Sequence, residues 1–153
     1  MVQLGVYNAI LHDRSLAEAI KTTAELGLTG LEINTGGFLP PKHVPNIDAI
    51  LTSDAARDDF LANFEGTGVS IAGLNCNGNP LHPNPLIGEK HASDVVTSIK
   101  LAQRLGQNRV VTMSGLPGGE PGAKFTNWVV NAWNSAALDV IEYQWGVATK
   151  FWK

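Results

Sequence analysis

The sequence IAGLNCNGNPLHP, residues 71–83, changes from apolar to polar within a few positions. It opens with a short apolar run, and asparagines then follow at every second position, at Asn75, Asn77 and Asn79. Successive side chains of a β-strand point to opposite faces, so a strand that continued this far would place all three on one face. Buried asparagine is costly without hydrogen-bond partners. The stretch therefore predicts an apolar strand whose end forms one wall of a polar ligand site.

Composition sets the broad class of the protein. The chain has 153 residues, 44% of them apolar, which suffices for a single domain over residues 1–153 with a hydrophobic core. The net charge is −3 and the Lys and Arg residues are scattered, which argues against a nucleic-acid partner. Cys76 is the only cysteine, so a disulfide framework and a cysteine-based zinc site are excluded. No apolar run is long enough to span a membrane, and the N-terminus lacks a signal-peptide pattern, so we expect a cytoplasmic protein with no membrane partner.

Short apolar runs alternate with helical patterns along the chain. The runs predict strands over residues 4–7, 30–34, 69–74 and 110–113. Ser15 and Glu18 have the spacing of a capping box and predict the start of a first helix. Ser53 is expected to cap a second helix. A third helix over residues 91–105, with Ile99 among its inward positions, and a fourth over 128–152 follow from the 3.6-residue period.

These units repeat at a period of about 40 residues, which is typical of stacked supersecondary units. Strands that are apolar throughout and alternate with helices indicate a parallel sheet covered by helices. A (β/α)8 barrel and an open doubly wound sheet both fit this order. The chain contains neither a GxGxxG nor a GxxxxGK[ST] phosphate-binding pattern, which favours the barrel. A barrel needs eight strands, however, and this chain supplies half of them.

Segments spread along the chain resemble one known family. They are LGVYNAIL, GLTGLEINTGGFLPP, LNCNGNPLHP and VVTMSGLPGG, in this order. Together they resemble the N-terminal half of the sugar phosphate isomerase/epimerase family, which has the xylose-isomerase-like TIM barrel that endonuclease IV and inosose dehydratase share. The resemblance implies an α/β fold of four βα units, half of a (β/α)8 TIM barrel.

The resemblance also implies an activity in carbohydrate metabolism. Such proteins isomerise or epimerise a sugar or sugar phosphate by metal-assisted proton transfer. Their manganese, cobalt or magnesium ion is held by Glu, Asp, His and Glu from later barrel strands, so we expect no metal ligand in this chain and activity only as part of a complete barrel. The alternatives are a non-catalytic half-barrel or assembly subunit, and a related lyase or dehydratase acting on an oxidised sugar.

Two titratable residues are the candidates for catalysis. Glu32 interrupts an apolar strand, where it either accepts a hydrogen bond from a sugar hydroxyl or forms a structural ion pair. His82 lies in the loop beyond the asparagines, where it either acts as an acid or base or fixes backbone carbonyls.

The candidates for substrate binding are polar residues at predicted strand ends, namely Asn8, Asn75, Asn77, Asn79 and Ser114. For the three clustered asparagines, Asx-turns within the loop are the alternative.

Other residues are assigned to the surface or the core. The remaining histidines, His12, His43 and His91, are expected at the surface. Cys76 is expected to be a small core residue. Of the four tryptophans, Trp145 and Trp152 are expected to pack in the core, and either Trp128 or Trp133 to line the pocket.

Four strands leave both sheet edges and the inner face uncovered. We therefore expect an apolar inner face that is covered by a second copy of the chain, as a homo-oligomer, or by a C-terminal half.

Overall fold

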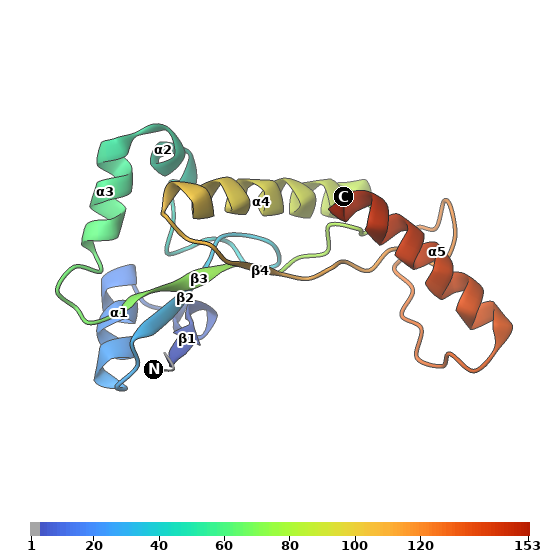
Figure 1. Ribbon diagram of the computed structural model, residues 1–153, viewed down its shortest axis with the longest axis horizontal. Helices are drawn as coiled ribbons and strands as arrows, with labels where there is room; N and C mark the ends of the chain where they lie inside the picture. Colours follow the sequence, from blue (N-terminus) through green and yellow to red (C-terminus); the bar gives the residue numbers. More distant parts are fainter. Residues whose placement is uncertain (1–3) are drawn as a thin grey trace.

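Four parallel strands form one sheet in the order β1-β2-β3-β4 in the computed structural model, which describes residues 4–153 (Figure 1). The strands are β1 (Gly5–Tyr7), β2 (Gly30–Asn34), β3 (Ser70–Cys76) and β4 (Val110–Thr112). Each strand pairs with the next one along the chain. This sequential order is that of a barrel wall, whereas a doubly wound sheet reverses its order at a switch point. The predicted half of a TIM barrel is confirmed.

Helices follow each of the strands, and most begin at a capping side chain. The helices are η1 (Asn8–Leu11), α1 (Leu16–Glu25), α2 (Ile47–Thr52), α3 (Asp54–Ala62), α4 (Pro85–Arg104) and α5 (Ser135–Trp152). The predicted capping box is present at α1, where the Ser15 amide donates to Glu18 Oε2 at 2.8 Å and the Glu18 amide donates to Ser15 Oγ at 3.3 Å. The predicted cap of α3 is also confirmed, because the Ala56 amide donates to Ser53 Oγ.

Three helix starts differ from the sequence prediction. Helix α4 begins at Pro85 rather than at residue 91, because proline is tolerated in the first turn and Asn84 caps the helix by accepting from the Leu86 amide at 3.0 Å. Helix α2 was not predicted, although Asn46 caps it in the same way. Helix α5 begins after its cap Asn134 rather than at residue 128.

The hydrophobic core lies between the sheet and its helices. It contains Leu31 and Ile33 of β2 and Leu74 of β3, which pack with residues of α1 and α4 such as Ile20 and Leu101. Each such buried side chain contributes about 1.5–3 kcal/mol relative to an exposed one. Cys76 is fully buried, as predicted. Ile99 is 53% exposed, so its predicted inward position is wrong.

The opposite face of the sheet is polar and lined by small residues. Strand alternation places Gly5, Tyr7, Gly30, Glu32 and Asn75 on the side away from the core residues. In a closed barrel this side faces the interior, which in most TIM barrels is filled by bulky branched side chains. The expectation of an apolar inner face is therefore wrong, because β1 and β2 carry glycine, tyrosine and glutamate at these positions.

Residues 113–153 differ from the rest of the molecule. Residues 113–134 form a long excursion after β4, and α5 extends beyond the end of the sheet (Figure 1). Helix α5 has no buried residue. Trp145 and Trp152 are 68% and 42% exposed, so their predicted core positions are wrong. Within residues 4–153, no helix is long and apolar enough to cross a membrane.

Candidate functional site

A buried network of amides holds the ends of β1 and β2 together. The side chain of Asn8 is fully buried, and its Oδ1 accepts from the Asn34 amide at 2.8 Å. Asn8 Nδ2 lies 2.8 Å from His43 Nδ1, and His43 Nε2 lies 3.0 Å from the carbonyl oxygen of Arg14. A carbonyl only accepts, so Nε2 of His43 carries the proton and Nδ1 accepts from Asn8. Both ends of the Asn8 amide thus bind protein groups, and its contact with substrate stays a prediction.

Asn34 fixes the loop that follows β2. Its Nδ2 donates to the carbonyl oxygens of Leu39 and Pro40, at 3.2 and 2.9 Å, and its Oδ1 accepts from the Tyr7 hydroxyl at 3.1 Å. Burial raises the pKa of Tyr7, and the carboxylate of Glu32 raises it further. Tyr7 therefore keeps its proton and remains a donor in this network.

Glu32 and Asn75 form a pair on the inner face of the sheet. Asn75 Nδ2 donates to Glu32 Oε1 at 2.6 Å, and Asn75 Oδ1 accepts from the Asn77 amide at 3.1 Å. No hydrogen bond within residues 4–153 involves Glu32 Oε2. Of the two alternatives for Glu32, a structural ion pair is not found within these residues. The structure thus brings together two predicted site residues, and their roles in a site stay predictions.

Asn79 clamps the loops after β3 and β4 to each other. Its Oδ1 accepts from the Leu116 amide at 2.7 Å, and its Nδ2 donates to the Leu116 carbonyl at 2.8 Å. The same Oδ1 accepts from the Leu81 amide at 3.2 Å, and the Asn79 amide donates to His91 Nδ1 at 2.9 Å. The side chain therefore binds both the N–H and the C=O of Leu116, as a neighbouring strand would.

Two of the histidines expected at the surface are buried. His43 and His91 are only 3% and 6% exposed, so the expectation is wrong for both. For His91 a signal was available, because it shares a helical stripe with the buried residues Val95 and Ser98 once α4 is extended to Pro85. His12 is half-buried, and its Nε2 has no hydrogen-bond partner within residues 4–153.

His82 forms a hydrogen bond within its own loop. Its Nδ1 accepts from the Asn84 amide at 3.0 Å, so the neutral ring carries its proton on Nε2. Its side chain lines a groove between the start of α4 and the end of α5, together with Glu89 and Phe151. The predicted catalytic role of His82 stays a prediction.

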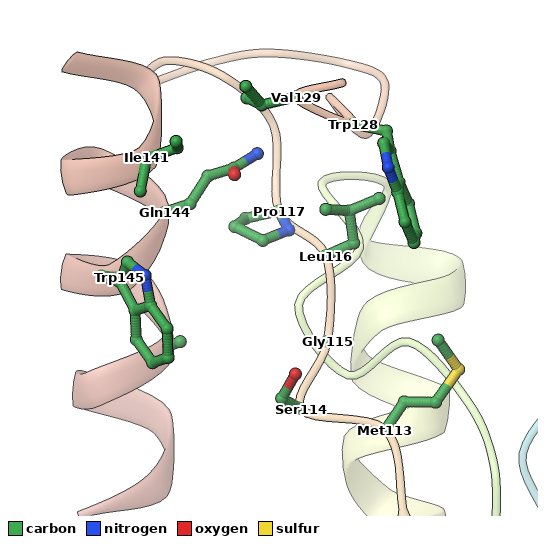
Figure 2. A pocket seen from close by; sticks show the side chains of 11 residues that line it. Met113, Ser114, Gly115, Leu116, Pro117, Trp128, Val129, Ile141, Gln144 and Trp145 are labelled. Atoms are coloured by element: carbon green, nitrogen blue, oxygen red, sulfur yellow. The ribbon is translucent and has the colours of Figure 1, made fainter. Parts of the chain in front are cut away.

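Ser114 opens onto a cleft of about 400 Å³ between the excursion and α5 (Figure 2). Trp145 and Ile141 of α5 line one side, and Leu116, Pro117 and Trp128 line the other. Sequence reasoning did not predict this cleft, because it placed Trp145 in the core.

The described residues do not fit a divalent metal by themselves. Across residues 4–153 no three His, Cys, Asp or Glu side chains lie close enough together to hold a metal ion. A metal in a complete site would need ligands from outside residues 4–153.

Comparison with known proteins identifies the family. Residues 20–143 match the family described as "Xylose isomerase-like TIM barrel", which includes sugar isomerases, epimerases and endonucleases and often uses divalent metals. The chain is 37% identical over 139 residues to "Uncharacterized protein YfiH" of Bacillus subtilis (strain 168). That alignment covers 89% of this chain and 44% of the relative, so the chain spans less than half of the relative's length. With four sequential parallel strands and a match over most of its length, the chain belongs to the xylose isomerase-like TIM barrel family.

Proposed function

We propose that this chain supplies the first half of the pocket of a sugar or sugar phosphate isomerase or epimerase. The reaction is a proton transfer on the sugar, assisted by a divalent metal whose ligands lie outside residues 4–153. Family membership supports the reaction class, and the polar inner face of the sheet supports a polar substrate.

The Glu32–Asn75 pair is the observation that carries this proposal. A carboxylate on the barrel side of a strand is costly unless it is hydrogen-bonded. Asn75 binds one oxygen at 2.6 Å and so fixes the orientation of the group. The other oxygen accepts from a sugar hydroxyl. Glu32 thereby positions the sugar, and Asn75 positions Glu32.

His82 is the second candidate for proton transfer. The bond from the Asn84 amide leaves the Nε2 proton for donation to a sugar oxygen. His82 lines the α4–α5 groove, whose lining does not include Glu32 or Asn75, so we assign the larger role to Glu32.

Exchange of substrate protons with solvent tests the proposal. The chain is combined with the part of the Bacillus subtilis relative that it does not match, and incubated in D2O with aldoses, ketoses and Mn²⁺, Co²⁺ or Mg²⁺. We expect deuterium to enter the sugar at the carbon beside the carbonyl group, as followed by NMR. Glu32→Gln should lower kcat/KM by about 10-fold or more, because the charged acceptor becomes a neutral one.

Glu25→Gln is the matched control, since Glu25 is an exposed residue at the end of α1. Equal losses of kcat/KM in both variants would show that Glu32 has no specific role in the reaction. Sugar binding without any exchange would favour the alternative of a non-catalytic half-barrel, and loss of water from an oxidised sugar would favour the dehydratase alternative.

A covering partner is also part of the proposal. The two open edges of the sheet leave backbone groups that a second barrel half would pair, whether this half comes from a second copy or from a C-terminal half. Sedimentation of the 153-residue chain separates these cases, because a stable monomer at micromolar concentration would contradict the homo-oligomer.

A further inference from the structure

We propose that the cleft between residues 113–118 and α5 binds a flat, uncharged group attached to the sugar. The natural substrate is then a neutral glycoside with an apolar aglycone rather than a sugar phosphate. This inference rests on the proposed function and names its substrate class.

Hydrogen bonds between α5 and residues 114–127 define the two sides of the cleft. At one end the Trp152 indole N–H donates to the Ser114 carbonyl at 2.9 Å. Further along α5, Gln144 Nε2 donates to the Asn127 carbonyl at 2.6 Å, and the Gly118 carbonyl lies 3.4 Å from the same nitrogen. These bonds hold α5 at a fixed distance from the excursion, with space left between them.

The lining is apolar and carries no charge. Figure 2 shows Trp145 on α5 and Trp128 across from it, with Leu116 and Pro117 between them. Ser114 and Gln144 are the two lining residues with polar side chains. A cleft of about 400 Å³ falls in the range of small-molecule sites, which are mostly apolar with a few polar groups.

The residues that line the cleft disfavour a phosphate group. Phosphate sites in proteins use Arg, Lys or a row of backbone N–H donors at a helix N-terminus. No Lys or Arg lines the cleft, and α5 faces it with the middle of the helix, at Ile141, Trp145 and Ala148. Exposed indole rings instead offer broad apolar surfaces to a flat group. Trp128 and Trp145 are 71% and 68% exposed, so both are available for such contact.

The cleft is continuous with the end of the sheet. Ser114 and Met113 line it directly after β4, and the Asn79 clamp ties Leu116 to the loop after β3. A sugar held at the strand ends would therefore direct a substituent toward the cleft.

Calorimetric titration of the 153-residue chain tests this inference. The probes are matched phenyl and methyl β-D-glycosides of glucose, galactose and xylose, with glucose 6-phosphate as the charged probe. We expect one phenyl glycoside to bind about tenfold more tightly than its methyl counterpart, and glucose 6-phosphate to bind no better than the methyl glucoside. Trp128→Ala and Trp145→Ala should each remove most of the gain from the phenyl group.

Trp133→Ala is the matched control, because Trp133 is 93% exposed and lies outside the cleft lining. The subsite is overturned by equal binding of phenyl and methyl glycosides, by tighter binding of the phosphate, or by a gain that survives in both tryptophan variants. If a methyl glycoside still binds and Glu32→Gln weakens it, the proposed function stands without the subsite. If no probe binds, the subsite is overturned, and the deuterium exchange of the combined protein decides the proposed function separately.

Discussion

The two ends of the molecule use polar side chains in opposite ways. At the ends of β1–β3, asparagines and histidines are buried and bind backbone or each other, as Asn8 and Asn79 show. In residues 113–153 the polar contacts are few, and they fix α5 relative to residues 113–134. Large apolar side chains in this region are exposed. A polar residue at a strand end thus does not identify a ligand contact by itself, because it can equally satisfy the loop.

Among the polar residues, the largest expected loss of stability comes from the buried network. Asn8→Ala removes the partners of His43 Nδ1 and of the Asn34 amide, both of which are buried. Leaving two buried polar groups unpaired should lower the free energy of unfolding by about 3 kcal/mol. Urea denaturation followed by circular dichroism measures this.

Asn131→Ala is the control for that change, because Asn131 is an exposed asparagine that accepts from the Trp133 amide in the excursion. Its effect should stay within about 0.5 kcal/mol. Equal losses of unfolding free energy in the two variants would show that the asparagines at the two ends of the molecule contribute equally to stability.

A smaller effect on folding stability is expected when acidification protonates His12. Burial lowers the pKa of His12 from its ordinary value of 6.5, and the nearby His43 and Lys42 lower it further. As pH falls below about 6.5, the unfolded chain therefore binds a proton that the folded chain does not yet bind. Stability is present above this pH and is lost progressively as pH falls toward the lower folded pKa.

The measurement is the thermal midpoint between pH 7.5 and 5.5 for the wild type and for His12→Gln. The variant should lose less stability on acidification, because its side chain does not titrate. An unchanged pH slope would mean that burial does not perturb His12.

The smallest change in the free energy of unfolding is expected from a substitution in α5. Leu138 is 56% exposed, so Leu138→Ala should change the free energy of unfolding by no more than about 0.5 kcal/mol. Leu101 in α4 is fully buried, and Leu101→Ala should cost about 2–5 kcal/mol through lost packing and a cavity. Chemical denaturation of the two variants side by side compares the regions directly. A large loss in the Leu138 variant would show that α5 is covered in solution.

The fold was predictable because its signals are local. The capping box at Ser15 and the apolar run of β2 depend on a few neighbouring residues, and both are present as predicted. The start of α4 was missed because Pro85 reads as a loop residue unless Asn84 is recognised as a cap. Helix α2 was missed for the same reason at Asn46.

The candidate site was predictable only in part. That Glu32 and Asn75 approach each other follows from adjacent parallel strands, but which amides bind backbone depends on loop contacts distant in sequence. Asn79 and Leu116 are 37 residues apart, and no sequence pattern joins them. The exposure of Trp145 could not be predicted either, because an apolar helix stripe normally predicts burial.

All four tryptophans lie at positions 128, 133, 145 and 152, within the excursion and α5. Intrinsic indole fluorescence therefore reports on this end of the molecule and does not report on the sheet or on α1–α4. Circular dichroism in the far ultraviolet, by contrast, is dominated by the helices that cover the sheet. Monitoring one denaturation with both signals asks whether the protein melts as one cooperative unit. Separate midpoints would reveal that α5 detaches before the sheet unfolds.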